Sequence, residues 1–227
     1  MTDFELAVKY KPYIRFDQKE PFEITAVAYT VFIKDSQSKS FPKRRIVADW
    51  NEIEYVIEYA IWFDYDITHL YELEHLWIYV DKEGRVKEAE GSFHGKILRM
   101  VLPDTGQPLV EEENHLVVYS QPGKHAFLPE IRLFHLVPDL MKSCNEYAGI
   151  DGIAVPECYQ CHFDIENETV VQYIRNKYRF TPTMNFVRRI WKDTILMTWE
   201  KLASTIPNRI NAQVELMRIE RGEVTNG

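Results

Sequence analysis

The sequence predicts a mainly β, α+β protein, an antiparallel β-sandwich with C-terminal helices. Three observations predict this fold class. Runs of β-branched and alternating apolar residues dominate residues 1–130, turn-forming residues separate these runs, and helical spacing follows only afterwards. The aromatic share of 13% also favours wide, half-buried sheets. We therefore expect a sandwich domain over residues 1–130, with a helical part over residues 131–227 packed on it in one compact unit.

The predicted strands begin at residue 24, where β-branched and aromatic residues fill positions 24–33. Residues 53–63 place an apolar side chain at every second position, so one face of this strand should pack while the other is largely acidic. Residues 73–80 and 85–94 are expected to form a hairpin, because the intervening Asp-Lys-Glu-Gly supplies a turn. Two more strands are expected at residues 98–102 and 116–120.

The part after residue 130 has the spacing of helices. We expect helices over residues 138–147 and 168–178. Residues 185–204 carry apolar side chains with a period near 3.6 and give the clearest helix pattern in the chain, which Pro207 should end.

Composition narrows the classes of function. The hydrophobic share of 45% and the charged share of 27% are typical of folded domains. The net charge of -8 argues against a protein that coats nucleic acid or anionic lipid, since both need surplus cations. Small basic clusters such as Lys43-Arg44-Arg45 are then solvated faces, and no nucleic-acid partner is expected. No signal-peptide core or apolar run of membrane length is present, which predicts a cytoplasmic protein without a transmembrane segment.

The three cysteines fit a reducing compartment, because they are too few for a secreted disulfide framework. We expect Cys144, Cys158 and Cys161 to be reduced thiols. The alternative is a zinc site on the Cys158–Cys161 pair, completed by Cys144 and His162, although a stable zinc site usually has a second pair of ligands.

The segment Trp62 to Val80 carries the candidate chemistry. Strand alternation places Glu72 and Glu74 on the same face as an aliphatic run, and carboxylates at the edge of a core need partners. His69 precedes them in the turn, and Asp66 ends the strand before it. This mixed set suits Mg²⁺, Mn²⁺, Ca²⁺ or Zn²⁺, and predicts a divalent metal site formed by Asp66, His69, Glu72 and Glu74. The competing interpretation is a solvated strand end with a histidine in its turn.

The run His69-Leu70-Tyr71-Glu72-Leu73-Glu74, followed by an apolar strand, resembles a known motif. It is similar to the H-x-H-D-W-E strand entry of the β-sandwich superfamily that includes the necrosis-inducing (Nep1-like) and Vps62-related proteins. Tyr71 and Leu73 depart from that motif. The resemblance implies that His69, Glu72 and Glu74 replace its first His, its Asp and its Glu, with Asp66, or else Asp64, as the upstream acid. The membrane toxicity of the necrosis-inducing branch does not carry over.

The loop from Ser120 to Ala126, SQPGKHA, is similar to an S-x-G-x-H-A stretch of Vps62-related proteins, with one additional residue. The resemblance covers roughly residues 10–130, and the C-terminal helices have no counterpart in it. His125 in this loop, and His94 at the end of the returning hairpin strand, are candidate catalytic residues that would close the site. The remaining histidines, His75, His115 and His135, are interpreted as structural or surface residues.

Three functions remain open from the sequence. A bound divalent ion would polarise an oxygen and activate water, so the protein would hydrolyse a phosphate or glycosidic substrate. In the second, the ion only bridges to a small molecule or a polar headgroup such as that of a sugar or lipid. In the third, the site is vestigial and the helices serve assembly. The sequence lacks the usual nucleotide-loop, dinucleotide, hydrolase-elbow and zincin motifs.

Overall fold

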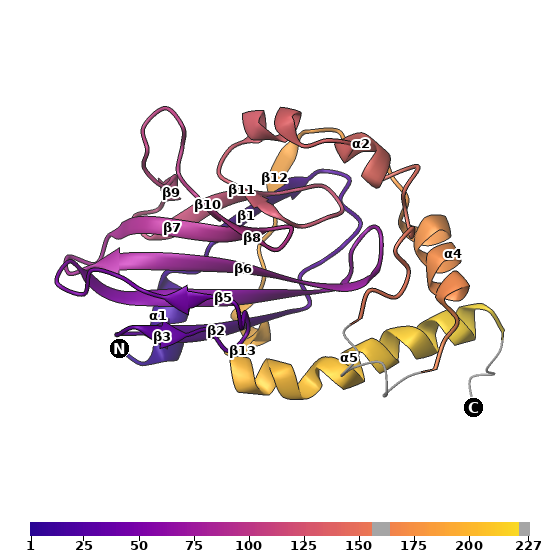
Figure 1. The fold of residues 1–227 in the computed structure, drawn as a ribbon, viewed down its shortest axis with the longest axis horizontal. Helices are drawn as coiled ribbons and strands as arrows, with labels where there is room; N and C mark the ends of the chain where they lie inside the picture. Colours follow the sequence, from indigo (N-terminus) through magenta and orange to yellow (C-terminus); the bar gives the residue numbers. More distant parts are fainter. Residues whose placement is uncertain (156–163, 223–227) are drawn as a thin grey trace.

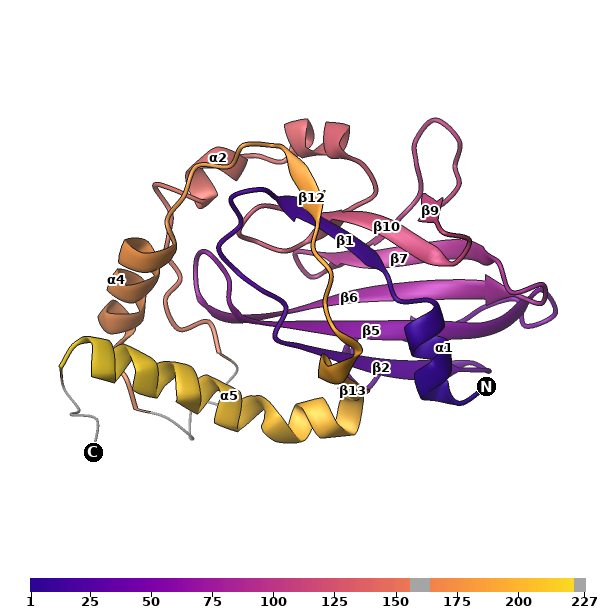
Figure 2. The ribbon, with the colours of Figure 1, turned by 180° about the vertical axis from the view of Figure 1, so that it is seen from behind.

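The computed structural model describes residues 1–155 and 164–222. They form an α+β fold in which two sheets lie one behind the other and helices cover one end and one edge (Figure 1). Figure 2 shows the opposite side, where β1 (Tyr13–Asp17) and β12 (Phe186–Arg188) lie in front of the larger sheet. The predicted fold class, mainly β with a C-terminal helix, is confirmed.

The larger sheet has six strands within the described residues, in the order β13-β2-β5-β6-β7-β8. Its strands are β2 (Ala26–Phe32), β5 (Ile53–Tyr65), β6 (Leu70–Asp81), β7 (Val86–Phe93), β8 (Lys96–Arg99) and β13 (Leu196–Thr198). The long β5 and β6 form its centre. Their inward side chains, among them Ile57, Ile61, Leu76 and Ile78, belong to the main core.

The second sheet has the order β11-β10-β1-β12, with β9 paired to β10. Its remaining strands are β9 (Val110–Glu111), β10 (His115–Ser120) and β11 (Phe127–Leu128). Most neighbours are antiparallel, but β1 pairs with β10 and β13 pairs with β2 in parallel. The sheets are therefore mixed, because late segments of the chain return to add edge strands. A short hairpin of β3 (Ser36–Gln37) and β4 (Arg45–Ile46) stands apart.

The predicted hairpin of residues 73–80 and 85–94 is confirmed. Strands β6 and β7 pair antiparallel, with Leu76 opposite Gly91. Asp81 Oδ1 accepts hydrogen bonds from the backbone N–H groups of Glu83 and Arg85, at 3.0 and 2.8 Å, which fixes the turn. Gly84 has a φ of 81°, which a glycine adopts without the steric cost of a side chain.

The second face of β5 differs from the prediction of a largely acidic surface. Glu58 on that face is only 1% exposed, because the segment around β3 and β4 covers it. Its carboxylate accepts hydrogen bonds from Ser40 Oγ at 2.7 Å and from Trp77 Nε1 at 2.7 Å. Sequence alternation identifies the two faces but not the distant loop that covers one of them.

The helices agree with the prediction in part. A first helix, α1 (Asp3–Lys9), was not expected, whereas α4 (Asn167–Tyr178) matches the helix predicted over residues 168–178. The helix predicted over residues 138–147 is reduced to α2 (Leu140–Ser143), after the 3₁₀ turn η1 (Ile131–Leu136).

The helix predicted over residues 185–204 is wrong for most of its length. This segment forms β12, the 3₁₀ turn η2 (Asp193–Ile195) and β13, and only then α5 (Trp199–Glu220). Pro207 lies inside α5 and does not end it. Tertiary contacts decide both outcomes: β12 and β13 each pair along the edge of a sheet, and α5 buries a stripe of apolar residues. That stripe is Leu202, Ile206, Ile210, Val214 and Met217.

The helices after residue 130 lie around the end of the sheets where β5 turns into β6 (Figure 1). Helix α5 runs along the β13–β2 edge, and α4 stands beside the end of the sheets where β5 turns into β6 (Figure 1). The chain after residue 130 thus contributes one strand to each sheet as well as helices. Within residues 1–155 and 164–222, no helix combines the length and apolar character needed to cross a bilayer.

Candidate metal centre

The connection between β5 and β6 is a tight loop that Asp66 organises. Asp66 Oδ1 accepts hydrogen bonds from Thr68 N at 2.6 Å and Thr68 Oγ1 at 2.9 Å, and the Asp66 N–H donates to His69 O at 2.9 Å. Aspartate favours this arrangement because its short side chain bonds to the backbone two residues further on. Oδ1 is thus occupied within the loop, while Oδ2 forms an ion pair with the Lys124 ammonium, whose Nζ lies 2.9 Å away.

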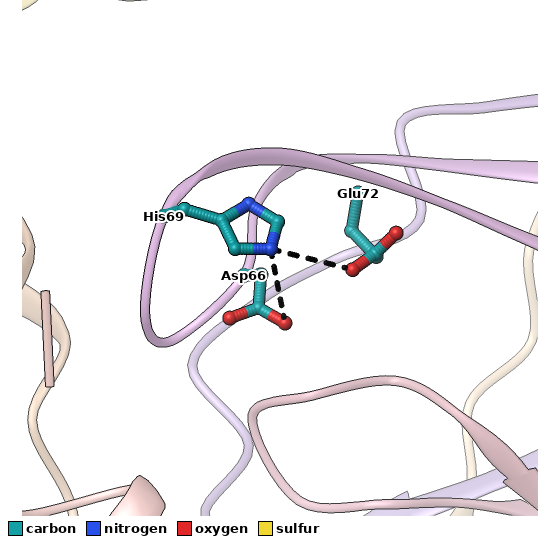
Figure 3. Close-up of side chains that lie close together, drawn as sticks. All are labelled: Asp66, His69 and Glu72. Atoms are coloured by element: carbon teal, nitrogen blue, oxygen red, sulfur yellow. Dashed lines mark ion pairs between the residues drawn. The ribbon is translucent and has the colours of Figure 1, made fainter. Parts of the chain in front are cut away.

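His69 turns one ring nitrogen toward this carboxylate. Its Nδ1 lies 3.2 Å from the carbonyl oxygen of Leu70. A carbonyl only accepts hydrogen bonds, so Nδ1 carries a proton in this contact. Nε2 lies 3.9 Å from Asp66 Oδ2 and 3.7 Å from Glu72 Oε2 (Figure 3). Nε2 is therefore the nitrogen through which the neutral ring would bind a metal.

His69 and Glu72 point to one place because His69 lies in the loop just before β6. Residues three apart on a regular strand face opposite sides of the sheet. The β5–β6 ladder pairs Phe63 with Glu72 and Tyr65 with Leu70 in one register, so Leu70 and Glu72 share a face. Tyr71 between them has a φ of 52°, a left-handed conformation. Its ring stacks on Trp62 with the ring centroids 4.7 Å apart.

Three of the four predicted ligands come together. One ligand atom each from Asp66, His69 and Glu72 lies within 4.8 Å of the others. The Asp66 side chain is fully buried, whereas those of His69 and Glu72 are 16% and 22% exposed. An ion between them would therefore be anchored from inside and reachable from solvent.

Burial and neighbouring charges shift the pKa values of the two carboxylates at this site. Burial alone would raise the pKa of Asp66, but His69, Lys124 and His125 outweigh it and hold that pKa below its ordinary value. Burial raises the pKa of Glu72, and the nearby Asp66 carboxylate raises it further. A cation placed between the two carboxylates would lower the cost of ionising both.

Glu74, the fourth predicted ligand, is not among these three. Two residues along a strand correspond to about 6.6 Å, so its carboxylate lies further along β6. It accepts a hydrogen bond from Ser92 Oγ on β7. Burial raises the pKa of Glu74 well above its ordinary value, and the charge of Glu72 adds to this effect. Strand alternation predicts that Glu72 and Glu74 share a face, but it does not predict which of the two carboxylates is close enough to the β5–β6 loop to join Asp66 and His69.

The predicted catalytic histidines have other partners. His94 occupies the β7–β8 turn with a φ of 49°, and its Nε2 lies 2.8 Å from Gln121 Oε1. His125 is fully buried and stacks on Phe63 with centroids 3.8 Å apart. Its Nε2 lies 3.6 Å from Glu20 Oε1, without a hydrogen bond. His125 acts on the pKa of Asp66, but neither histidine is in the group of three ligand atoms.

Sequence reasoning missed one residue that contacts the candidate ligands. Lys124 Nζ lies 2.9 Å from Asp66 Oδ2. It comes from the loop after β10, which approaches closely because position 123 is glycine: a Cβ on Gly123 would lie 2.8 Å from Ile67. The SQPGKHA stretch marks this loop in the sequence, but a contact between residues 58 positions apart has no local signal.

The predicted thiols are described only at Cys144. It is free and buried, and its Sγ donates to the carbonyl oxygen of Pro122 at 3.1 Å. Burial raises the pKa of this thiol, which makes it a packed group rather than a nucleophile. Cys158, Cys161 and His162, on which the alternative zinc site depends, lie outside the described residues.

No family model, curated protein or solved structure matches this chain. The function is therefore inferred from the geometry of the chain itself.

Proposed function

We propose that Asp66, His69 and Glu72 form a divalent-metal centre through which the protein acts on a polar, oxygen-rich ligand. The observation that carries the proposal is the approach of three potential ligand atoms to within 4.8 Å, at a loop whose histidine turns Nε2 toward both carboxylates. The fully buried Asp66 carboxylate supports it further, since a buried charge calls for a cation beside it and Lys124 alone lies there among the described residues.

The donor set bears on the kind of ion. Two carboxylates and one imidazole suit Mn²⁺ or Zn²⁺, while Mg²⁺ requires several waters and Ca²⁺ prefers six to eight oxygens. Among the four predicted ions, the donor set therefore favours Mn²⁺ and Zn²⁺ over Mg²⁺ and Ca²⁺. His69 is the residue that makes this difference.

Hydrolysis of a phosphate or glycosidic substrate is the activity that this geometry supports best. Catalytic metal sites typically use three protein ligands and leave a position open for water or substrate, whereas structural sites are closed by four. Here three side chains converge and two of them are partly exposed. The bound ion would supply Lewis acidity, while the chain anchors it through Asp66 and orients it through His69 and Glu72.

A non-catalytic module that binds a sugar or a lipid headgroup through the ion is the second candidate. The placement of His94 and His125 favours it, because both histidines are engaged or buried away from the three ligand atoms. A hydrolase needs a general acid or base within hydrogen-bond reach of its substrate. Turnover of p-nitrophenyl phosphate and p-nitrophenyl glycosides with added Mn²⁺ or Zn²⁺ separates the two: release of nitrophenol that His69→Ala removes supports the enzyme.

Metal binding itself is tested by calorimetric titration and thermal unfolding with each of the four ions. We expect one site per chain and a higher melting temperature with the preferred ion, because binding to the native state alone stabilises it. Glu72→Ala should abolish both effects. Glu88→Ala, which removes an exposed carboxylate from β7, is the matched control and should bind as the wild type does. Binding that survives Glu72→Ala would overturn the proposal.

We also propose that the chain is a remote member of the superfamily of Nep1-like and Vps62-related sandwiches and works in a reducing compartment such as the cytoplasm. The spacing from His69 to Glu72 at a strand entry supports the first statement. The buried free thiol of Cys144 supports the second.

A further inference from the structure

Lys124 occupies the inner side of the candidate metal centre. Its Nζ lies 3.0 Å from Asp66 Oδ1, 2.9 Å from Asp66 Oδ2 and 2.8 Å from Thr68 Oγ1. The side chain is only 15% exposed. The ammonium group thus sits on the carboxylate that would anchor the ion, held by the same loop.

The charge at Lys124 is fixed by its surroundings. Burial alone would lower its pKa, but Asp66 outweighs that effect, and Glu72 and Asp151 add to it, so the pKa is raised. The ammonium is a cation under all ordinary conditions. Without a metal ion it compensates the buried Asp66 charge, which would otherwise be costly.

An ion bound to Asp66 Oδ2 would meet this ammonium at short range. The same oxygen is in contact with Nζ at 2.9 Å, so an ion at coordination distance and the ammonium would be close neighbours of like charge. The lysine stem is long and flexible, which allows the ammonium to withdraw when an ion arrives. One carboxylate would therefore serve the ammonium and the ion in turn.

We infer that Lys124 is a built-in counter-cation that competes with the divalent ion for Asp66 and thereby sets the metal affinity of the centre. The inference rests on the proposed metal site and adds its regulation. It implies that the ion-free protein is a stable, charge-balanced state, and that metal occupancy follows the concentration of free ion.

The test compares Mn²⁺ affinity by calorimetry in four proteins. Lys124→Met removes the charge and keeps most of the apolar stem, and we expect about tenfold tighter binding of Mn²⁺ because the repulsion is gone. Lys124→Arg keeps the charge and should not bind more tightly than the wild type. Lys142→Met is the matched control: it removes an exposed lysine that is 51% accessible, changes the net charge equally, and should leave the affinity unchanged.

Thermal unfolding supplies a second readout. In EDTA, Lys124→Met should melt below the wild type, because Asp66 is left buried and unpaired; saturating Mn²⁺ should close this gap. If Lys124→Met does not fold in EDTA, Lys124→Gln, which retains a hydrogen-bond donor for Asp66, takes its place. Equal or weaker Mn²⁺ binding by the neutral variants overturns the inference.

The outcomes separate this inference from the metal proposal. Binding by the wild type with no gain in Lys124→Met leaves the metal centre standing and removes the role of Lys124. Mn²⁺ binding by Lys124→Met but not by the wild type supports the competition between the two cations. It also overturns the proposed function, because the Lys124 ammonium would then keep the ion out of the natural protein. Binding by neither protein overturns both.

Discussion

At the scale of single residues, His75 shows how strongly burial decides chemistry here. Its Nε2 lies 3.1 Å from Ser40 Oγ, which in turn donates to Glu58 Oε1 at 2.7 Å. The hydroxyl proton is used on Glu58, so His75 Nε2 donates to Ser40 and the ring is neutral. Burial lowers the pKa of His75 to about 3. This agrees with the structural role that its position within a strand predicts.

We predict that His75 makes the protein sensitive to acid. The folded pKa of about 3 lies below the ordinary value of 6.5, so the unfolded chain binds more protons between these values and stability falls as pH falls through this window. The loss is up to about 1.4 kcal/mol per pH unit. In chemical denaturation from pH 7 to pH 4, His75→Gln should lose less free energy of unfolding than the wild type. The exposed control His135→Gln should follow the wild type, and an equal slope in all three proteins would contradict this account.

Single residues also show where prediction from sequence succeeds. His69 and Glu72 are predicted together because their spacing is local, and the structure brings them to one point. Glu74 is predicted from the same alternation but is held by Ser92, a contact set by the pairing of two strands. The sequence does not indicate that Lys124 contacts Asp66, because the loop that carries Lys124 follows a strand of the other sheet.

At the scale of elements, the C-terminal segment shows that tertiary packing can override the secondary structure that the local apolar spacing predicts. Residues 186–188 and 196–198 have apolar spacing compatible with a helix, yet they complete the edges of two sheets. Strand pairing satisfies their backbone groups with partners far away in the chain, which no local period reveals. The strands of the β5–β6–β7 meander are predicted well, because their turns and alternation are both local.

Pro207 provides a prediction at this scale. It lies in the interior of α5, where proline removes a hydrogen bond to the preceding turn, and packing by Ile206 and Ile210 keeps the helix intact. Pro207→Ala should therefore raise the free energy of unfolding by about 1–3 kcal/mol. Asn208→Ala, at the exposed neighbouring position, should gain only a few tenths of a kcal/mol through helix propensity. Equal effects of the two substitutions in denaturant titrations would show that the proline costs the helix nothing.

At the scale of the whole molecule, the site sits where three parts of the fold meet. The β5–β6 loop bonds to the Gly123 loop through Ile67 N at 2.7 Å, and to the segment before α4 through Leu70 N and Gly152 O at 2.9 Å. The two sheets bury a common core that extends under this end. The loop is therefore positioned by both sheets and by the C-terminal part.

We accordingly predict that the protein stays folded when no divalent ion is bound. The apolar core is continuous between the sheets, and Lys124 compensates Asp66 in the ion-free state. Circular dichroism in EDTA should show an unchanged spectrum at 25 °C, with a melting temperature below that of the ion-bound protein. Binding at a hundredfold excess over Kd contributes about 2.7 kcal/mol. Loss of the β-sheet spectrum in EDTA would show instead that the ion is a structural requirement.

Anomalous diffraction from crystals grown with Mn²⁺ tests the central claim most directly. The account predicts one strong manganese peak at the turn between β5 and β6, about 2.0–2.6 Å from Asp66 Oδ2, His69 Nε2 and a Glu72 oxygen. Lys124 Nζ should have moved away from Asp66 in the same crystals. No peak at this turn at saturating Mn²⁺, with the ammonium still on Asp66, would contradict the account.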